Sequence, residues 1–144
     1  MKPANLKYED VKIGEVYIFE KVFFQEDAEK FAELSGDFNP LHTDTHYAQA
    51  TEFKKPVIHG MLLSALFSRL VGMFCPGRNC LYLSQSLQFR APVYPGDVLT
   101  VRGTVTQKTD SGRMITLKTE ILVRDEVAVT GEAKAKFITE SGHV

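Results

Sequence analysis

An aspartate and a histidine five residues apart carry the clearest chemical signal in this chain: Asp37 and His42. Gly36 can adopt a positive φ, and Pro40 fixes its own φ and biases Asn39 away from the helical region, so the backbone must turn here. A carboxylate and a neutral imidazole near one point can hold a water molecule and move its protons. Taken singly, Asp37 is also typical of a turn, and His42 of a histidine bonded to the backbone. Together they predict general acid–base catalysis.

The segment from residue 56 to residue 61 predicts a second functional element, the start of a helix that can bind an oxyanion. Gly60 opens an apolar stretch that is typical of a buried helix, and the free N–H groups at a helix N-terminus suit developing negative charge. We expect His59 to brace the loop or cap this helix at the substrate-binding end, with direct catalysis as the alternative. Asn39 is expected to orient a substrate carbonyl or to brace its own turn.

Length, charge and cysteine content limit the class of protein. The 144 residues are enough for a core, and we expect residues 1–144 to form a single domain. A net charge of −1 argues against nucleic acid as a partner. No apolar run is long enough to span a membrane and no signal segment is evident, so we expect a cytoplasmic protein. Cys75 and Cys80 are accordingly expected to be reduced thiols.

The hydrophobic pattern predicts one strand, a helical region and then strands to the end of the chain. We expect a strand at 14–24, a helix from Glu26 or Asp27 to Gly36, and a helix at 60–72 that is apolar nearly all round and therefore buried. Further strands are expected at 81–93, 99–106, 115–123 and 127–137. The last two pair with Lys118 opposite Glu132 and leave a three-residue loop at 124–126. This pattern indicates an α+β fold, in which an antiparallel sheet of about five strands wraps around a buried central helix.

Residues 31–42, followed by Ala48, resemble the signature of the MaoC-like (R)-specific enoyl-CoA hydratases, also called hydratase 2. The shared pattern contains Gly-Asp-x-Asn-Pro-x-His and an alanine six residues after the histidine. The resemblance implies the hotdog fold, a homodimer with acyl-thioester sites at its interface, and hydration of a trans-2-enoyl thioester to the (R)-3-hydroxyacyl product. It also implies that Asp37 and His42 contact the attacking water, while the Gly60 N–H binds the thioester oxygen. Residues 88–93 resemble a further family segment, which we interpret as strand geometry.

Three alternatives stand beside this hydratase. A 3-hydroxyacyl-ACP dehydratase would perform the reverse reaction with acyl carrier protein in place of coenzyme A. A thioesterase would carry a carboxylate on or near the central helix, but no Asp or Glu occurs from residue 60 to residue 72. A non-catalytic acyl-thioester-binding domain would have little reason to keep both Asp37 and His42.

Neither a metal nor a cofactor is expected. His42, Asp44 and His46 are ligand types, and a His-x-x-x-His spacing places two imidazoles on one helical face. However, Pro40 lies just upstream, and hydration of an enoyl thioester needs no metal. No glycine-rich nucleotide-binding motif occurs. Five apolar residues are candidates to line the acyl pocket, and most of them fit the core equally well: Phe38, Met61, Leu62, Leu66 and Phe67.

Overall fold

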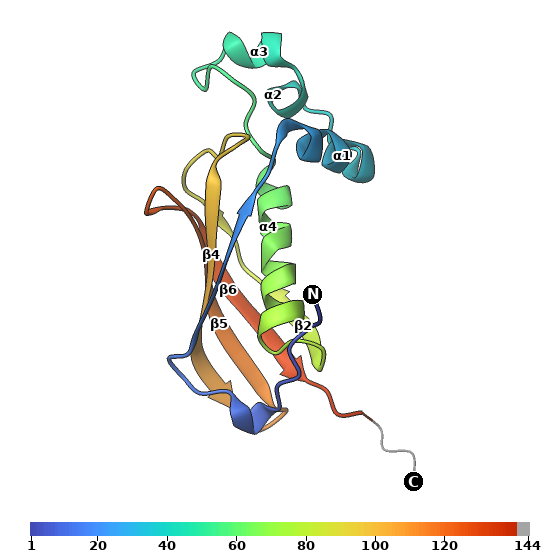
Figure 1. The fold of residues 1–144 in the computed structure, drawn as a ribbon, viewed down its shortest axis with the longest axis vertical. Helices are drawn as coiled ribbons and strands as arrows, with labels where there is room; N and C mark the ends of the chain where they lie inside the picture. The colour runs from blue at the N-terminus through green and yellow to red at the C-terminus, as the bar shows by residue number, and fades with distance from the viewer. Residues whose placement is uncertain (141–144) are drawn as a thin grey trace.

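Six antiparallel strands form one curved sheet in the computed structural model, which describes residues 1–140 (Figure 1). The sheet order is β1 (Val16–Val22), β4 (Val98–Thr109), β5 (Met114–Val123), β6 (Glu126–Phe137) and β2 (Cys80–Gln85), and the short β3 (Gln88–Phe89) also pairs with β6. Alternating side chains such as Val101, Leu117 and Val129 are fully buried. The expected antiparallel sheet is therefore confirmed.

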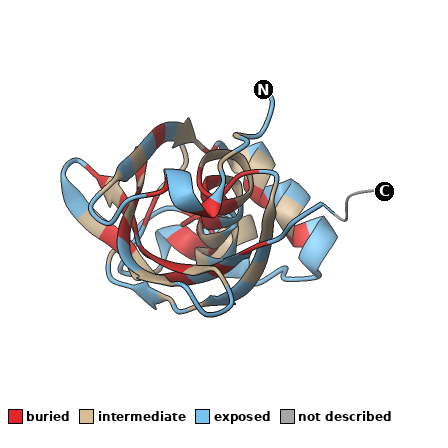
Figure 2. Cartoon of the chain, turned by 90° about the horizontal axis from the view of Figure 1, so that it is seen from below, coloured by how far each residue is buried: buried red, intermediate tan, exposed pale blue. Residues whose placement is uncertain are grey.

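Helix α4 (Gly60–Arg69) packs against the inner face of this sheet, and the π-helical turn η2 (Leu70–Phe74) continues it. Seen from below, the strands curve around the helix with buried residues on the inside (Figure 2). The turn η2 approaches β4 closely because Gly103 has no side chain. A Cβ at Gly103 would lie 2.7 Å from Cδ2 of Leu70, which is fully buried. The absent side chain thus allows η2 to lie close to the sheet.

The outer side of α4 differs from the expectation of a helix buried all round. Leu63 and Phe67 face the sheet and are buried, whereas Met61, Ala65 and Ser68 are exposed. The exposed residues follow one another at spacings of four and three, so they form one stripe along the helix. The sheet of one chain therefore covers one side of α4 and leaves the other side open.

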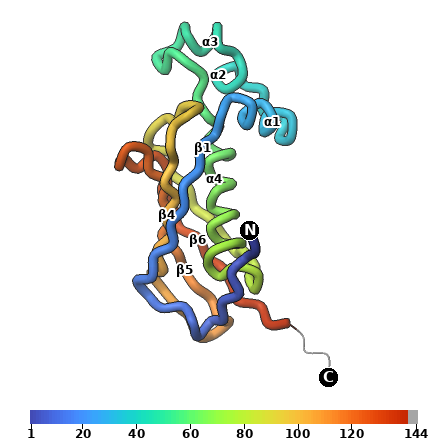
Figure 3. The backbone as a smooth tube through the Cα atoms, viewed as in Figure 1, coloured from blue at the N-terminus to red at the C-terminus, as the bar shows by residue number. Residues whose placement is uncertain are grey.

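Three short helices lie beyond one end of α4 (Figure 3). They are α1 (Gln25–Ser35), α2 (Pro40–Thr43) and α3 (Thr45–Gln49), and a separate 3₁₀ turn, η1 (Tyr8–Asp10), precedes β1. The predicted stop of the first helix at Gly36 is confirmed, because Gly36 caps α1 in the left-handed region with φ 81°. Among the described residues, no helix has the length and apolar character needed to cross a membrane.

The hairpin between β5 and β6 is tighter than expected. Lys118 does pair with Glu132, but the register shifts between Ile121 and the next residue, so the loop has two residues where three were predicted. Arg124 and Asp125 make this loop with φ of 50° and 61°. Positive φ at both positions is what the tightest hairpin turns require, and the bulge supplies the offset.

The predicted strand at 81–93 is also wrong in its extent. It is interrupted after Gln85 and ends at Phe89. At the interruption, the Ser86 carbonyl oxygen occupies the space beside Gly131, where an added Cβ would lie only 1.8 Å away. The N–H groups of Arg90 and Ala91 still donate to the Ala128 carbonyl of β6, and the chain then reaches the segment before α4, where Ile58 donates to the Val93 carbonyl at 2.8 Å.

Candidate active site

His42 is held in a single tautomer by the backbone. It lies in the one-turn helix α2, not on an open loop. Its Nδ1 lies 2.7 Å from the Val57 carbonyl oxygen, and a carbonyl only accepts, so Nδ1 carries the proton. The Gln25 side chain donates to the His42 carbonyl at 2.9 Å and fixes the backbone. In the neutral tautomer that this bond selects, Nε2 is a hydrogen-bond acceptor.

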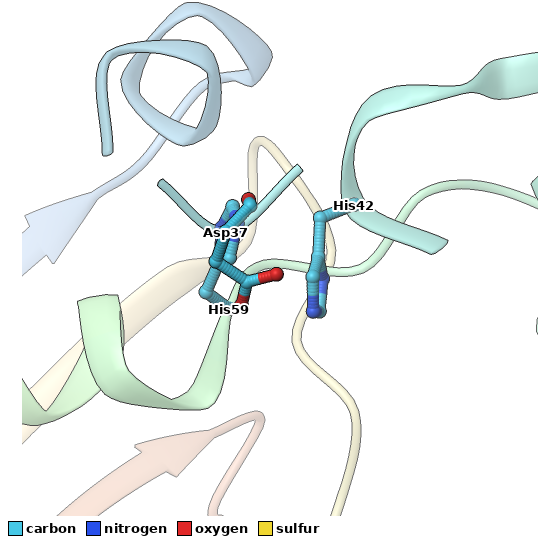
Figure 4. Close-up of side chains that lie close together, drawn as sticks. All are labelled: Asp37, His42 and His59. Carbon is cyan, nitrogen blue, oxygen red and sulfur yellow. The ribbon is translucent and has the colours of Figure 1, made fainter. Parts of the chain in front are cut away.

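Asp37 is exposed in the loop before α2, and its carboxylate points toward His42 (Figure 4). Oδ1 accepts the Asn39 N–H at 3.1 Å, and the Asp37 N–H donates to the Ser35 hydroxyl at 3.1 Å. One side-chain N or O atom from each of Asp37, His42 and His59 lies within 4.8 Å of the others. Because a water molecule makes two hydrogen bonds of about 2.8 Å each, it can bridge acceptors at this separation.

Asn39 acts on the backbone. Its Oδ1 accepts the Leu41 N–H at 3.0 Å, which makes Asn39 the N-cap of α2. The Thr43 hydroxyl donates to the Asn39 carbonyl at 3.2 Å. Of the two roles that the sequence offers, this geometry favours the bracing of the turn that carries His42.

His59 is the most buried member of the cluster, with 1% of its surface exposed. Its Nε2 donates to the Asp37 carbonyl oxygen at 3.1 Å. Burial lowers the pKa of His59 from its ordinary 6.5, so the ring is neutral at neutral pH. The ring stacks on that of His42, with centroids 4.0 Å apart and an interplanar angle of 27°.

This stacking disfavours a metal ion at the cluster. The lone pairs of imidazole lie in the ring plane, and two nearly parallel planes whose ring centroids lie 4.0 Å apart do not converge on one ion. Zinc would require both nitrogens at about 2.0–2.1 Å. Asp44, a candidate ligand in the sequence, instead accepts the Tyr47 N–H at 3.0 Å as the N-cap of α3.

A mostly apolar cavity of about 440 Å³ adjoins the three polar residues and extends to the first residue of α4. This volume suits a small-molecule site. Gly60 lines the cavity, and the Phe89 ring packs against it, so that a Cβ at Gly60 would lie 2.8 Å from Phe89 Cε1. Glycine at this position therefore accommodates a neighbouring ring as well as any ligand that approaches its N–H.

Comparison with known proteins identifies the family. Residues 7–137 match the family model described as MaoC like domain. The chain belongs to the MaoC-like family. An (R)-specific enoyl-CoA hydratase of Aeromonas caviae is 42% identical over 130 residues, which cover 90% of this chain and 97% of that protein. A 3-hydroxybutyryl-CoA dehydratase of Methylorubrum extorquens is 37% identical over 131 residues, which cover 91% and 83%.

The fold of this MaoC-like chain matches that of a solved relative. The structure of an (R)-hydratase from A. caviae involved in PHA biosynthesis superposes with a TM-score of 0.87 at 42% identity. The superposition covers 90% of this chain and 98% of that one. The expected hotdog fold is therefore confirmed.

In this MaoC-like chain the predicted polar residues, Asn39 apart, and Gly60 line one cavity, whereas most of the apolar residues of its wall were not predicted. Of the five apolar residues expected to line the pocket, Met61 does so, whereas Phe67 belongs to the core. The wall comes instead from Phe53, Ile58 and the segment 89–93. The family-like pattern at 88–93 carried the signal, but its interpretation as strand geometry overlooked the turn toward α4.

Proposed function

We propose that this chain is an (R)-specific enoyl-CoA hydratase, which adds water to a trans-2-enoyl-CoA and also catalyses the reverse dehydration. The observation that carries the proposal is a pair of acceptors beside one cavity. These are the Asp37 carboxylate and the His42 ring, whose Nδ1–H is committed to the Val57 carbonyl. Membership of the MaoC-like family and the activities named for its relatives support the same reaction.

In the proposed hydration, one water molecule donates hydrogen bonds to Asp37 and to Nε2 of His42. The two acceptors orient the water oxygen toward C3 of the enoyl group. As the O–C3 bond forms, an O–H bond of the water breaks, its proton passes to the pair, and the C2–C3 π electrons move toward the thioester oxygen. The pair then delivers a proton to C2. Because the two groups share that proton, base and acid are roles of the pair.

The negative charge that develops on the thioester oxygen needs a donor, and we assign this role to the Gly60 N–H. Gly60 is the first residue of α4, where N–H groups lack helical partners and the helix dipole is positive. It lines the same cavity as Asp37 and His42. One donor of this kind contributes roughly 10²- to 10³-fold to the rate.

The test follows the loss of enoyl-thioester absorbance when the protein is mixed with crotonyl-CoA, and reads product configuration with a stereospecific 3-hydroxyacyl-CoA dehydrogenase. We expect the (R)-product. Asp37→Asn and His42→Ala should each lower kcat by about 10²-fold or more without loss of fold. His46→Ala is a matched control, because that histidine is exposed on α3. Near-normal rates in either site variant would remove that residue from the mechanism.

The same assay separates the alternative functions. Faster turnover of crotonyl-ACP than of crotonyl-CoA would favour the ACP dehydratase, and release of free thiol would indicate a thioesterase. Binding of enoyl thioesters without turnover, for short, long and branched acyl groups on both carriers, would leave a non-catalytic binding domain.

We also propose that residues 1–144 form one MaoC-like domain that works as a homodimer. The support is exposed apolar surface at two places: Met61 on the open side of α4 is 59% exposed, and Leu81 and Leu83 on the edge strand β2 are 53% and 45% exposed. β2 ends the sheet order, so its outer backbone groups can pair with another strand. Sedimentation should give twice the mass of one chain, and Leu83→Lys should shift it toward the monomer. A monomeric wild type would refute the dimer.

A further inference from the structure

We propose that His59 is a positioning residue that aligns both members of the acid–base pair. The inference rests on the proposed function, since it concerns how that same site is held. His59 contacts the two catalytic residues in different ways. Its Nε2–H binds the Asp37 carbonyl at 3.1 Å, and its ring face lies against the His42 ring at 4.0 Å. A shift of this one ring would therefore displace both groups.

His59 is itself fixed from two further sides. The Phe31 ring of α1 meets it edge-on, with centroids 4.8 Å apart at 66°. The His59 carbonyl accepts the Leu63 N–H at 3.1 Å and so joins the hydrogen-bond ladder of α4. One buried residue thus connects α1, the Asp37 loop and the helix start that carries the Gly60 N–H. Catalytic geometry depends on such supporting contacts, because a misplacement of about 1 Å can cost 10²-fold in rate.

The protonation state of His59 suits support better than proton transfer. Nε2–H is committed to a carbonyl, and Nδ1 is buried without a hydrogen-bond partner among the described residues. A proton on Nδ1 would place a positive charge against the face of His42 and oppose the transfer of a proton to that ring. The neutral state that burial enforces avoids this repulsion. His59 therefore holds the pair without competing for the proton.

Two substitutions separate the two contacts. His59→Gln keeps an N–H donor at comparable reach but removes the ring that packs on His42. His59→Phe keeps a ring but removes the donor to the Asp37 carbonyl. We expect each to lower kcat for crotonyl-CoA by about 10- to 100-fold, with KM changed less than about threefold. His46→Gln and His46→Phe, at an exposed position of α3, are the matched controls and should leave both constants unchanged.

Double variants show whether His59 acts through its neighbours. In the His42→Ala background, His59→Gln should lower kcat by less than about twofold. In the Asp37→Asn background, His59→Phe should also lower kcat by less than about twofold. The reason is that the effects of residues that act as a unit are not additive. Equal losses in parent and double-variant backgrounds would overturn the inference, as would full activity in both single variants. If the wild type hydrates no enoyl thioester, the proposed function is wrong and the inference fails with it. An active wild type with unaffected His59 variants refutes the inference alone.

Discussion

Replacement of Gly60 by alanine is expected to lower kcat by about 100-fold because of the Phe89 ring. The new Cβ would lie 2.8 Å from Cε1 and 3.0 Å from two further ring atoms of Phe89. Carbon atoms in favourable contact are about 3.5–4.0 Å apart, so the ring or the first turn of α4 must move by a good part of 1 Å. Movement of the first turn would displace the Gly60 N–H from the proposed position of the thioester oxygen, and misplacement on this scale costs about 10²-fold.

The assay is steady-state hydration of crotonyl-CoA by Gly60→Ala, Phe89→Ala and the double variant. Removal of the ring removes the overlap, so alanine at position 60 should cost less than about 10-fold in the Phe89→Ala background. Gly72→Ala serves as the control, because a Cβ there would meet no atom within 4 Å. Equal losses in both backgrounds would show that the ring is not the cause. Unchanged rates in every variant would refute the placement of the donor at residue 60.

Three further predictions concern stability and reactivity. Burial lowers the pKa of His59 in the folded protein below its ordinary 6.5, so the unfolded chain gains a proton first as pH falls. Urea melts should therefore show a free energy of unfolding that drops as the pH falls below 6.5. The drop should be less steep in His59→Phe. Asn39→Ala removes the cap of α2 and should cost about 1 kcal/mol in thermal melts and lower kcat, whereas Asn39→Asp, which keeps an acceptor, should restore both. Burial raises the pKa of Cys75 to about 11, so a thiol reagent should modify this residue only as fast as the protein unfolds; rapid labelling of the native protein would contradict its burial.

The sequence was informative wherever a feature depends on nearby residues. Gly36 ends α1 because glycine adopts the left-handed conformation that the chain takes there without a steric penalty. Gly60 begins α4, and the position of Lys118 opposite Glu132 follows from the alternation of apolar residues. The spacing of Asp37 and His42 also indicated a shared site, because so short a segment can bring both to one point.

Features that depend on contacts between distant segments could not be read in this way. The bulge at Ile121 depends on the fit between sheet twist and a two-residue turn, and no local pattern marks it. The open side of α4 was unpredictable because a helix that is apolar nearly all round does not reveal which of its sides the sheet covers. Phe89 lines the pocket because β3 pairs with β6 and its ring packs against Gly60, contacts between segments that are distant in the sequence.

Val57 fixes the tautomer of the proposed catalytic histidine with its backbone and lines the cavity as well. Its carbonyl oxygen selects the tautomer of His42, while its side chain lines the cavity. Every residue type supplies the carbonyl, so substitution at this position can reshape the acyl pocket and leave the proton chemistry intact. Substrate range can therefore diversify here, by mutation or by design, without passing through an inactive intermediate.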